Sequence, residues 1–185
     1  IYWSMATSST HNAGKGIDTT DILGNPVHFS LHLCPATLVN PKIKNYIGKN
    51  TQVNLFKLEQ EINTFQIATK RILLNENYYL MVDRFVNLVL PINRAEDVVC
   101  VENAMGSTVS GATASFRNAA GKTAPLLEHI LYDHKQFLTF VNLQITEFND
   151  KIKHDTAFGE LGITDMKSLG EALYTNDLLE KNDRL

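Results

Sequence analysis

Two ionisable residues, Glu102 and His134, lie on otherwise apolar helical stripes and are the first candidates for chemistry. A carboxylate and an imidazole are suitable ligands for zinc or iron. Antiparallel helices can bring such side chains together inside a bundle, where helical proteins often hold metal ions. A di-iron bundle needs Glu-x-x-His pairs on two helices, and this sequence contains none. A buried hydrogen-bonded pair, or partial exposure of the two side chains, is therefore favoured over a metal or ligand site.

Residues 116–123 resemble the phosphate-binding pattern G-x-x-x-x-G-K-[ST] at Gly121, Lys122 and Thr123. The first glycine of that pattern lets the loop curl so that its amides face phosphate, and Phe116 stands in its place. The preceding residues are small and polar, whereas a phosphate loop follows a buried hydrophobic strand. We interpret Gly121 as the end of one helix and Thr123 with the following proline as the start of the next.

The remaining histidines and both cysteines give no site. His28 and His32 share the polar side of a predicted strand, with His11 upstream. Residues four apart on a strand are separated by roughly 13 Å, too far to share one ion. Cys34 and Cys100 each lie among apolar residues and are interpreted as buried thiols. No catalytic residue and no cofactor is therefore assigned, and a non-enzymatic protein is favoured over an enzyme.

The first fifty residues indicate an arm and a strand. Residues 4–26 are rich in Ser, Thr, Asn and Gly, which is typical of a loop or mobile arm. Residues 27–33 alternate between apolar and polar and predict a strand with no evident partner in the chain. Such an edge is a template for pairing with another chain. The residues predicted to contact a partner are Tyr2, Trp3, Val27, Phe29, Leu31 and Leu33.

Residues 51–153 predict helices, because apolar residues recur at steps of three and four. Helices are expected near 52–74, 78–89, 93–120 and 123–153, with Asn93 as an N-cap and Glu96 as its capping-box partner. Gly106 and Gly111 leave a loop at 105–115 as an alternative. Residues 139–146 also alternate as a strand would. Short connections make consecutive helices antiparallel.

The predicted fold is mainly α: an antiparallel four-helix up-down bundle with an N-terminal extended arm or strand and a short C-terminal helix. The predicted boundaries are an arm and strand at 1–50, the bundle at 51–153, and a tail with a short helix at 154–185. A chain of 185 residues is long enough for one such domain with appendages.

Charge and composition limit the function. The net charge is −3 with no dense basic run, so general nucleic-acid binding is not expected. No apolar run is long enough for a membrane span, and no intact signal peptide precedes the arm. Two cysteines and the absence of an Asn-x-Ser/Thr sequon favour an intracellular location.

These patterns favour a structural or interaction protein that self-associates, or that docks a protein partner through its N-terminal arm. The alternative is a helical bundle that binds a metal ion or small ligand near Glu102 and His134.

Overall fold

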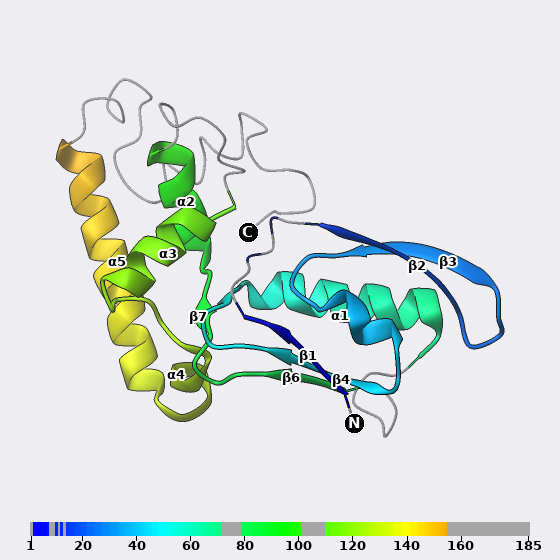
Figure 1. The fold of residues 1–185 in the computed structure, drawn as a ribbon. Helices are drawn as coiled ribbons and strands as arrows, with labels where there is room; N and C mark the ends of the chain where they lie inside the picture. Colours follow the sequence, from blue (N-terminus) through cyan, green and yellow to red (C-terminus); the bar gives the residue numbers. More distant parts are fainter. Residues whose placement is uncertain are drawn as a thin grey trace.

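The computed structural model describes residues 2–7, 10, 12, 14–71, 79–100 and 110–154. Strands and helices are mixed along this part of the chain, which makes the protein an α/β structure (Figure 1). The elements in order are β1 (Tyr2–Ala6), β2 (Lys15–Thr20), β3 (Pro26–Leu31), the 3-10 helix η1 (Ala36–Val39), β4 (Ile43–Ile47), β5 (Gln52–Val53), α1 (Leu55–Thr69), β6 (Tyr79–Val82), β7 (Asn87–Leu88), α2 (Pro91–Cys100), α3 (Ala112–Ala120), α4 (Leu127–Tyr132) and α5 (His134–His154).

A three-stranded parallel sheet has the order β1-β4-β6. Its register places Tyr2 beside Ile43 and Lys44 beside Tyr79. Helix α1 lies between this sheet and the β2–β3 hairpin in Figure 1. Ile47 and Leu80 are buried and belong to the same core as α1. The sheet therefore has an inner face toward α1 and an outer face on its other side.

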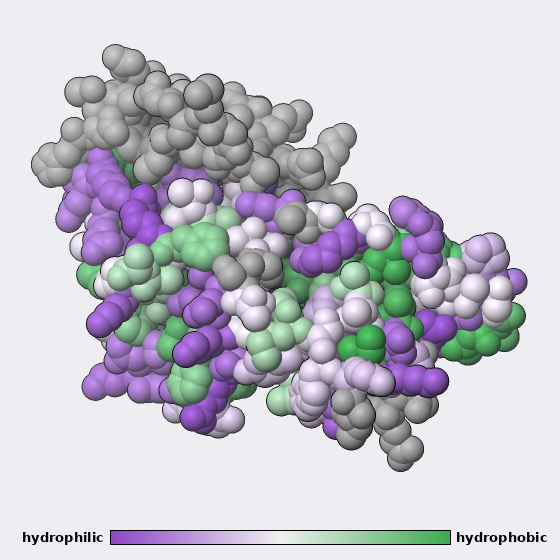
Figure 2. Space-filling model, in the orientation of Figure 1, coloured by the Kyte–Doolittle hydropathy of each residue, from purple (hydrophilic) through white to green (hydrophobic). Residues whose placement is uncertain are grey.

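The β2–β3 hairpin is fastened to the end of α1 by Asp21. This buried carboxylate accepts the backbone N–H groups of Leu23 and Asn25 at 2.8 and 2.9 Å and pairs with Lys70 Nζ at 2.6 Å. The Lys70 ammonium, with the Asn25 side chain, holds the pKa of Asp21 well below its ordinary value. The hairpin tip remains apolar and exposed, at the far right of Figure 2, where Ile22 is 61% exposed.

One apolar core joins the hairpin, α1 and the sheet. Phe29 and Phe65 meet edge to face, with ring centroids 6.2 Å apart. A buried carboxylate, Glu61, accepts the backbone N–H of Leu33 at 2.9 Å and that of Cys34 at 2.9 Å. Burial, reinforced by the nearby Glu61 charge, raises the pKa of the Cys34 thiol. Backbone donors thus satisfy the charge that this core contains.

The second half of the described chain is a helical layer joined to the first by a short parallel pair. Strand β5 pairs with β7, so that Val53 lies beside Leu88. Helix α2 packs on α3 and α5, and α4 packs on α5. In Figure 1 these helices gather at the opposite end of the molecule from the hairpin.

The predicted four-helix bundle is wrong. Residues 79–82 and 87–88, expected as helix, are strands that pair in parallel with β4 and β5. Parallel strands often read as nearly continuous apolar runs, so the sequence of Tyr79–Val82 resembles part of a helical stripe. The expected helix over 93–120 is also not continuous, because α3 begins after Gly111, whose φ of 84° is left-handed.

The two longest helical stripes are confirmed with altered limits. The first is α1, capped by Asn54, whose side chain accepts from Lys57 N. The second is divided at Asp133 into α4 and α5, and residues 139–146 are helical, not a strand. The alternative loop at 105–115 is wrong for residues 112–115, which lie in α3, while 101–109 lie outside the described residues.

The strand near residues 27–33 is confirmed as β3, but its predicted lack of a partner is wrong. Strand β2 pairs with it inside the part expected as a loop or mobile arm. Tyr2 and Trp3 lie in a strand of the parallel sheet. The predicted C-terminal helix lies outside the described residues. Among the helices that the structure describes, none has the length and apolarity needed to cross a membrane.

Candidate functional site

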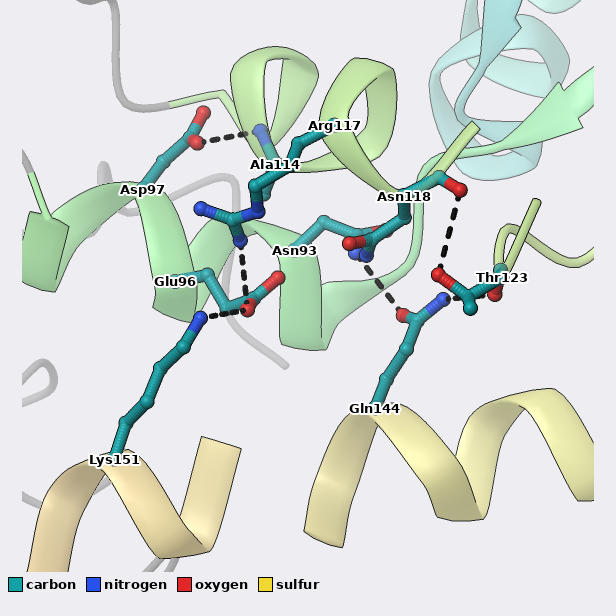
Figure 3. A network of polar contacts seen from close by, with 9 residues as sticks. All are labelled: Asn93, Glu96, Asp97, Ala114, Arg117, Asn118, Thr123, Gln144 and Lys151. Carbon is teal, nitrogen blue, oxygen red and sulfur yellow. Dashed lines mark hydrogen bonds and ion pairs between the residues drawn. The ribbon is translucent and has the colours of Figure 1, made fainter. Parts of the chain in front are cut away.

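Helices α2, α3 and α5 share a network of polar side chains that is unusually buried (Figure 3). In the described part of the first half, side chains bonded to one another form smaller groups, such as Asp21 with Asn25 and Lys70. The network side chains are Asn93, Glu96, Asp97, Arg117, Asn118, Thr123, Gln144 and Lys151. Because polar groups are costly to bury, such a concentration marks the candidate functional site.

Asp97 holds the junction between α2 and α3. Its two carboxylate oxygens accept the backbone N–H groups of Gly111 and Ala114 at 2.8 and 2.9 Å. These are N–H groups at the start of α3, where a negative charge is stabilising. A Cβ on Gly111 would lie 2.9 Å from the backbone nitrogen of Arg94, so only glycine allows this approach. Asp97 therefore joins α2 to the start of α3.

Glu96 gathers two cations on one oxygen. Its Oε1 accepts from Arg117 Nη2 at 2.8 Å and from Lys151 Nζ at 3.2 Å. The carboxylate is 5% exposed, and its Oε2 is buried with no hydrogen-bond partner among the described residues. Both cations are about half exposed and keep further N–H donors for other groups. This corner can therefore bind an anion from solvent.

A chain of amides links α2 to α5 and to the turn after α3. Asn93 Oδ1 accepts Leu90 N at 2.8 Å, and its Nδ2 donates to Gln144 Oε1 at 3.1 Å. Gln144 Nε2 then donates to the carbonyl of Thr123 at 3.0 Å. Asn118 accepts Thr123 N through its carbonyl, while its buried Nδ2 has no partner among the described residues. The helices are thus fixed, and one amide donor is left unused.

Ser115 ties this network to the short β5–β7 pair. Its buried hydroxyl lies 2.5 Å from Gln52 Oε1 and 3.3 Å from the carbonyl oxygen of Leu88. The hydroxyl has one hydrogen, and the shorter contact identifies Gln52 as its acceptor. The helical layer is therefore anchored to the first half of the molecule by a polar contact.

The six residues predicted to contact a partner fall into two groups. Tyr2 and Trp3 are 74% and 57% exposed on β1. Phe29, Leu31 and Leu33 are buried in the chain's own core. Val27 is half-buried and packs against that core. A role of these residues in contacting another polypeptide stays a prediction.

The residues predicted as metal candidates are not brought together by described contacts. Glu102 lies outside the described residues, and His134 is exposed at the start of α5. His28 is exposed and bonded to Asp18 at 2.8 Å, whereas His32 is half-buried. In the described ranges no three His, Cys, Asp or Glu residues are grouped to hold a metal ion.

Three network residues were predicted to have other roles: Asn93 and Glu96 as a capping box, and Thr123 at a helix start. The other network residues were assigned no role from the sequence. The capping-box interpretation is wrong: α2 begins at Pro91, two residues before Asn93, and Glu96 bonds to Arg117 instead. The sequence signal that could have indicated this network is the spacing of polar residues along α5. Gln144 and Lys151 are seven residues apart, so they lie on one face of α5. Their partners on α2 and α3 cannot be read from spacing.

A parallel sheet joined to a helical layer defines an α/β class of protein, with the buried polar network as its candidate site. The sequence profile described as Adenylosuccinate synthetase matches residues 5–179. The chain therefore belongs to the adenylosuccinate synthetase family.

Individual relatives agree. The chain is 29% identical to the adenylosuccinate synthetase of Mycosarcoma maydis over 133 residues, which are 70% of this chain and 29% of that protein. It is 28% identical to the enzyme of Chaetomium globosum over 134 residues, 69% of this chain and 29% of that protein. The chain therefore spans less than a third of the length of these curated relatives.

Two solved structures share the fold. The fully ligated adenylosuccinate synthetase from Plasmodium falciparum matches with a TM-score of 0.63 and 16% identity, covering 99% of this chain and 44% of that chain. The cyanophage S-2L succinoaminodeoxyadenylate synthetase, bound to dGMP and to dATP as an energy donor, matches with a TM-score of 0.50 and 21% identity, covering 72% and 35%.

Membership of this family corrects the predicted function. A non-enzymatic structural protein is contradicted, because the matching family is one of enzymes. The alternative of a helical bundle with a metal or ligand near Glu102 and His134 is contradicted with it. The sequence patterns had no catalytic motif to set against the apparent bundle.

Proposed function

We propose that this chain takes part in the synthesis of adenylosuccinate as a purine-nucleotide-binding portion of a synthetase. The observation that carries the proposal is the family match over residues 5–179. The curated relatives are adenylosuccinate synthetases of greater length, so this chain would supply a portion of the complete activity.

Adenylosuccinate, the product in the family name, carries several negative charges. Adenylosuccinate is an adenylate whose amino nitrogen carries a four-carbon dicarboxylate. The phage relative is described with dGMP and dATP, which are also purine nucleotides. Phosphates and carboxylates of this kind are bound by Arg forks, Lys ammonium groups and N–H donors.

Arg117 and Lys151 are the groups that we assign to the nucleotide phosphate. Both approach the buried Glu96 carboxylate from opposite helices, which fixes their positions while leaving about half of each side chain exposed. Arg117 and Lys151 share one oxygen of Glu96, so each keeps N–H donors that Glu96 does not use. An entering phosphate would therefore meet two oriented donors with little rearrangement.

The assignment is tested by isothermal titration of the 185-residue chain with dGMP and with adenylosuccinate. Arg117→Ala and Lys151→Ala should each weaken purine-nucleotide binding at least about tenfold, or ~1.4 kcal/mol. Lys153→Ala is the matched control, because Lys153 lies on the same helix and pairs with exposed Asp150 at 3.8 Å. Cytidine monophosphate is the matched ligand control.

If neither dGMP nor adenylosuccinate binds to the chain, the nucleotide-binding proposal is overturned. Binding that survives both substitutions would reject Arg117 and Lys151 as phosphate contacts. The complete activity is assayed as adenylosuccinate formed from a purine monophosphate, aspartate and a purine triphosphate, since aspartate carries the required nitrogen and carbon skeleton.

We also infer that the chain associates with another polypeptide through β1. The support is the exposure of Tyr2 and Trp3 on an edge strand of a parallel sheet. Sedimentation of the chain with and without Trp3→Ser measures whether it self-associates.

A further inference from the structure

The outer face of the parallel sheet carries two rows of large side chains. The register places Trp3, Lys44 and Tyr79 side by side across β1, β4 and β6. The next row on the same face is formed by Met5, Tyr46 and Met81. Alternate residues of a strand share a face, so all six side chains lie opposite the face that packs on α1.

This outer face is open and largely apolar. Trp3 and Met5 are 57% and 56% exposed, and Tyr79 and Met81 are each 37% exposed. Parallel sheets are found almost only with both faces covered. A group of neighbouring apolar side chains at the surface marks a contact site. Among the described residues, none forms a covering layer over this face.

The positive charge of Lys44 indicates which side chains a covering layer would contain. The Lys44 ammonium lies 5.0 Å from the Tyr79 ring centroid and 5.6 Å from that of Trp3. Among the described residues no carboxylate forms an ion pair with Lys44. The carboxylate bonded to the next row, Asp83, accepts from the Tyr46 hydroxyl, which raises the pKa of Tyr46. A covering layer thus needs apolar side chains around a carboxylate placed over Lys44.

The Plasmodium falciparum structure is much larger than the part that matches this chain, and its remaining part is a source for such a layer. The match uses 99% of this chain but 44% of that chain, so more than half of the larger fold has no counterpart here. We propose that the outer face docks a polypeptide layer from that remaining part of the family fold, with a carboxylate opposite Lys44. The proposal rests on the fold, and its test involves no activity.

Two other occupants fit less well. A second copy stacked on the same face would bring another Lys44, and its Asp83 is already engaged by Tyr46 and by the backbone N–H of Phe85. Single-stranded nucleic acid stacks on aromatic side chains but also requires a basic groove. These two rows contain a single lysine, and the chain has a net charge of −3.

The test uses the Mycosarcoma maydis synthetase without its matched 133 residues, expressed as a separate chain and mixed with the 185-residue protein. We expect a complex in sedimentation. Lys44→Glu should weaken it at least tenfold, because two carboxylates would then repel. Lys49→Glu is the matched control, since Lys49 is exposed in the turn after β4. Circular dichroism and thermal melting verify that both variants fold.

Maleimide labelling of a Met5→Cys variant locates the contact. The complex should slow labelling at least tenfold relative to the free chain, which exposes Met5. A chimera in which this chain replaces the matched region of the Mycosarcoma enzyme gives the same measurement if the separate portion does not fold alone. If Met5→Cys is labelled in both the complex and the chimera as fast as in the free chain, the proposal is overturned.

Two further results would overturn it in favour of another occupant. Concentration-dependent protection of Met5→Cys in the chain alone would assign the face to a second copy. Trp3 is the sole tryptophan, so quenching of its fluorescence by a single-stranded oligonucleotide would assign the face to nucleic acid.

Discussion

The two halves of the described chain bury polar groups in different ways. Around α1, the Glu61 carboxylate is surrounded by apolar side chains and accepts backbone N–H groups of Leu33 and Cys34. Between α2, α3 and α5, side chains bond to the backbone and also to one another, as Asn93 does to Gln144 and Glu96 to Arg117. Two atoms of this network, Glu96 Oε2 and Asn118 Nδ2, are buried with no partner among the described residues, whereas the first half has one such atom, His32 Nδ1.

This difference separates a part built for stability from a part that carries a site. Unpaired buried polar atoms cost stability, and proteins keep them where function requires them. Backbone partners, in contrast, cannot be exchanged for a ligand without unfolding. Substitutions around α1 should therefore change the free energy of unfolding, whereas those around Glu96 should change binding more than stability.

The largest effect is expected for Glu61→Ala. Two buried backbone N–H groups, which share three contacts with the carboxylate, would lose their acceptor. At roughly 1.5–3 kcal/mol for a charge-assisted bond, we expect a loss of about 4 kcal/mol in the free energy of unfolding, measured in urea. Glu59→Ala, exposed on the same helix, should change it by less than about 0.5 kcal/mol. Equal effects would end the distinction between buried and exposed carboxylates of α1.

A smaller loss of stability is expected for Asp97→Ala. This substitution removes the acceptor of Gly111 N and Ala114 N at the start of α3. Loss of such a cap costs about 2 kcal/mol at the upper end of measured values. Chemical denaturation measures the loss, and Asp133→Ala, which removes an exposed cap on Gln136 N, is the control with a smaller expected change. A loss as large as that of Glu61→Ala would make the network a stability element.

The hairpin contact predicts a pH dependence. The pKa of Asp21 is lowered in the folded state by Lys70 and Asn25, so its stabilising contribution is present above the unfolded value of about 3.9. That contribution is lost as the pH falls below this value toward the lowered folded pKa. Between pH 7 and pH 3, the melting temperature should therefore decrease less for Asp21→Asn than for the wild-type chain. Parallel slopes for the two proteins would contradict the role of Asp21.

The smallest change in stability is expected for Glu96→Gln. Arg117 and Lys151 are about half exposed, so both cations stay hydrated when their carboxylate partner is lost. We expect less than about 1 kcal/mol in unfolding, because ion pairs with such exposed partners contribute little. Titration with dGMP should nevertheless change, since the two cations lose the group that orients them. A stability loss above 3 kcal/mol with unchanged nucleotide binding would reverse the comparison.

Local signals in the sequence predicted part of this fold. The stripe through Leu58 and Phe65 identifies α1, and alternation through Phe29 identifies β3, because each pattern reports one buried face. The stripe through Met81 and Val82 misled, because β6 is short and lies in a parallel sheet. Its partner, β4, is far away in sequence, and no local period encodes that pairing.

The candidate site was less accessible to sequence reasoning than the fold. Asn93 and Glu96 were visible as polar residues at a helix start, but their partners Gln144 and Arg117 lie on other helices. Such contacts depend on how α2, α3 and α5 pack. The left-handed Gly111, needed for the close approach to α2, read only as a weak point in a helix.

The parallel register of the sheet also bears on the order in which the chain folds. Strands β2 and β3 are neighbours in sequence, and α1 forms from contiguous residues, so both require only short loops to close. The pairing of Tyr2 with Ile43, and of Val53 with Leu88, must instead close long loops at a greater entropic cost. We therefore expect the hairpin and α1 to form early, with Asp21 and Lys70 joining them. The parallel pairs, and with them the outer face, would assemble last and limit the folding rate.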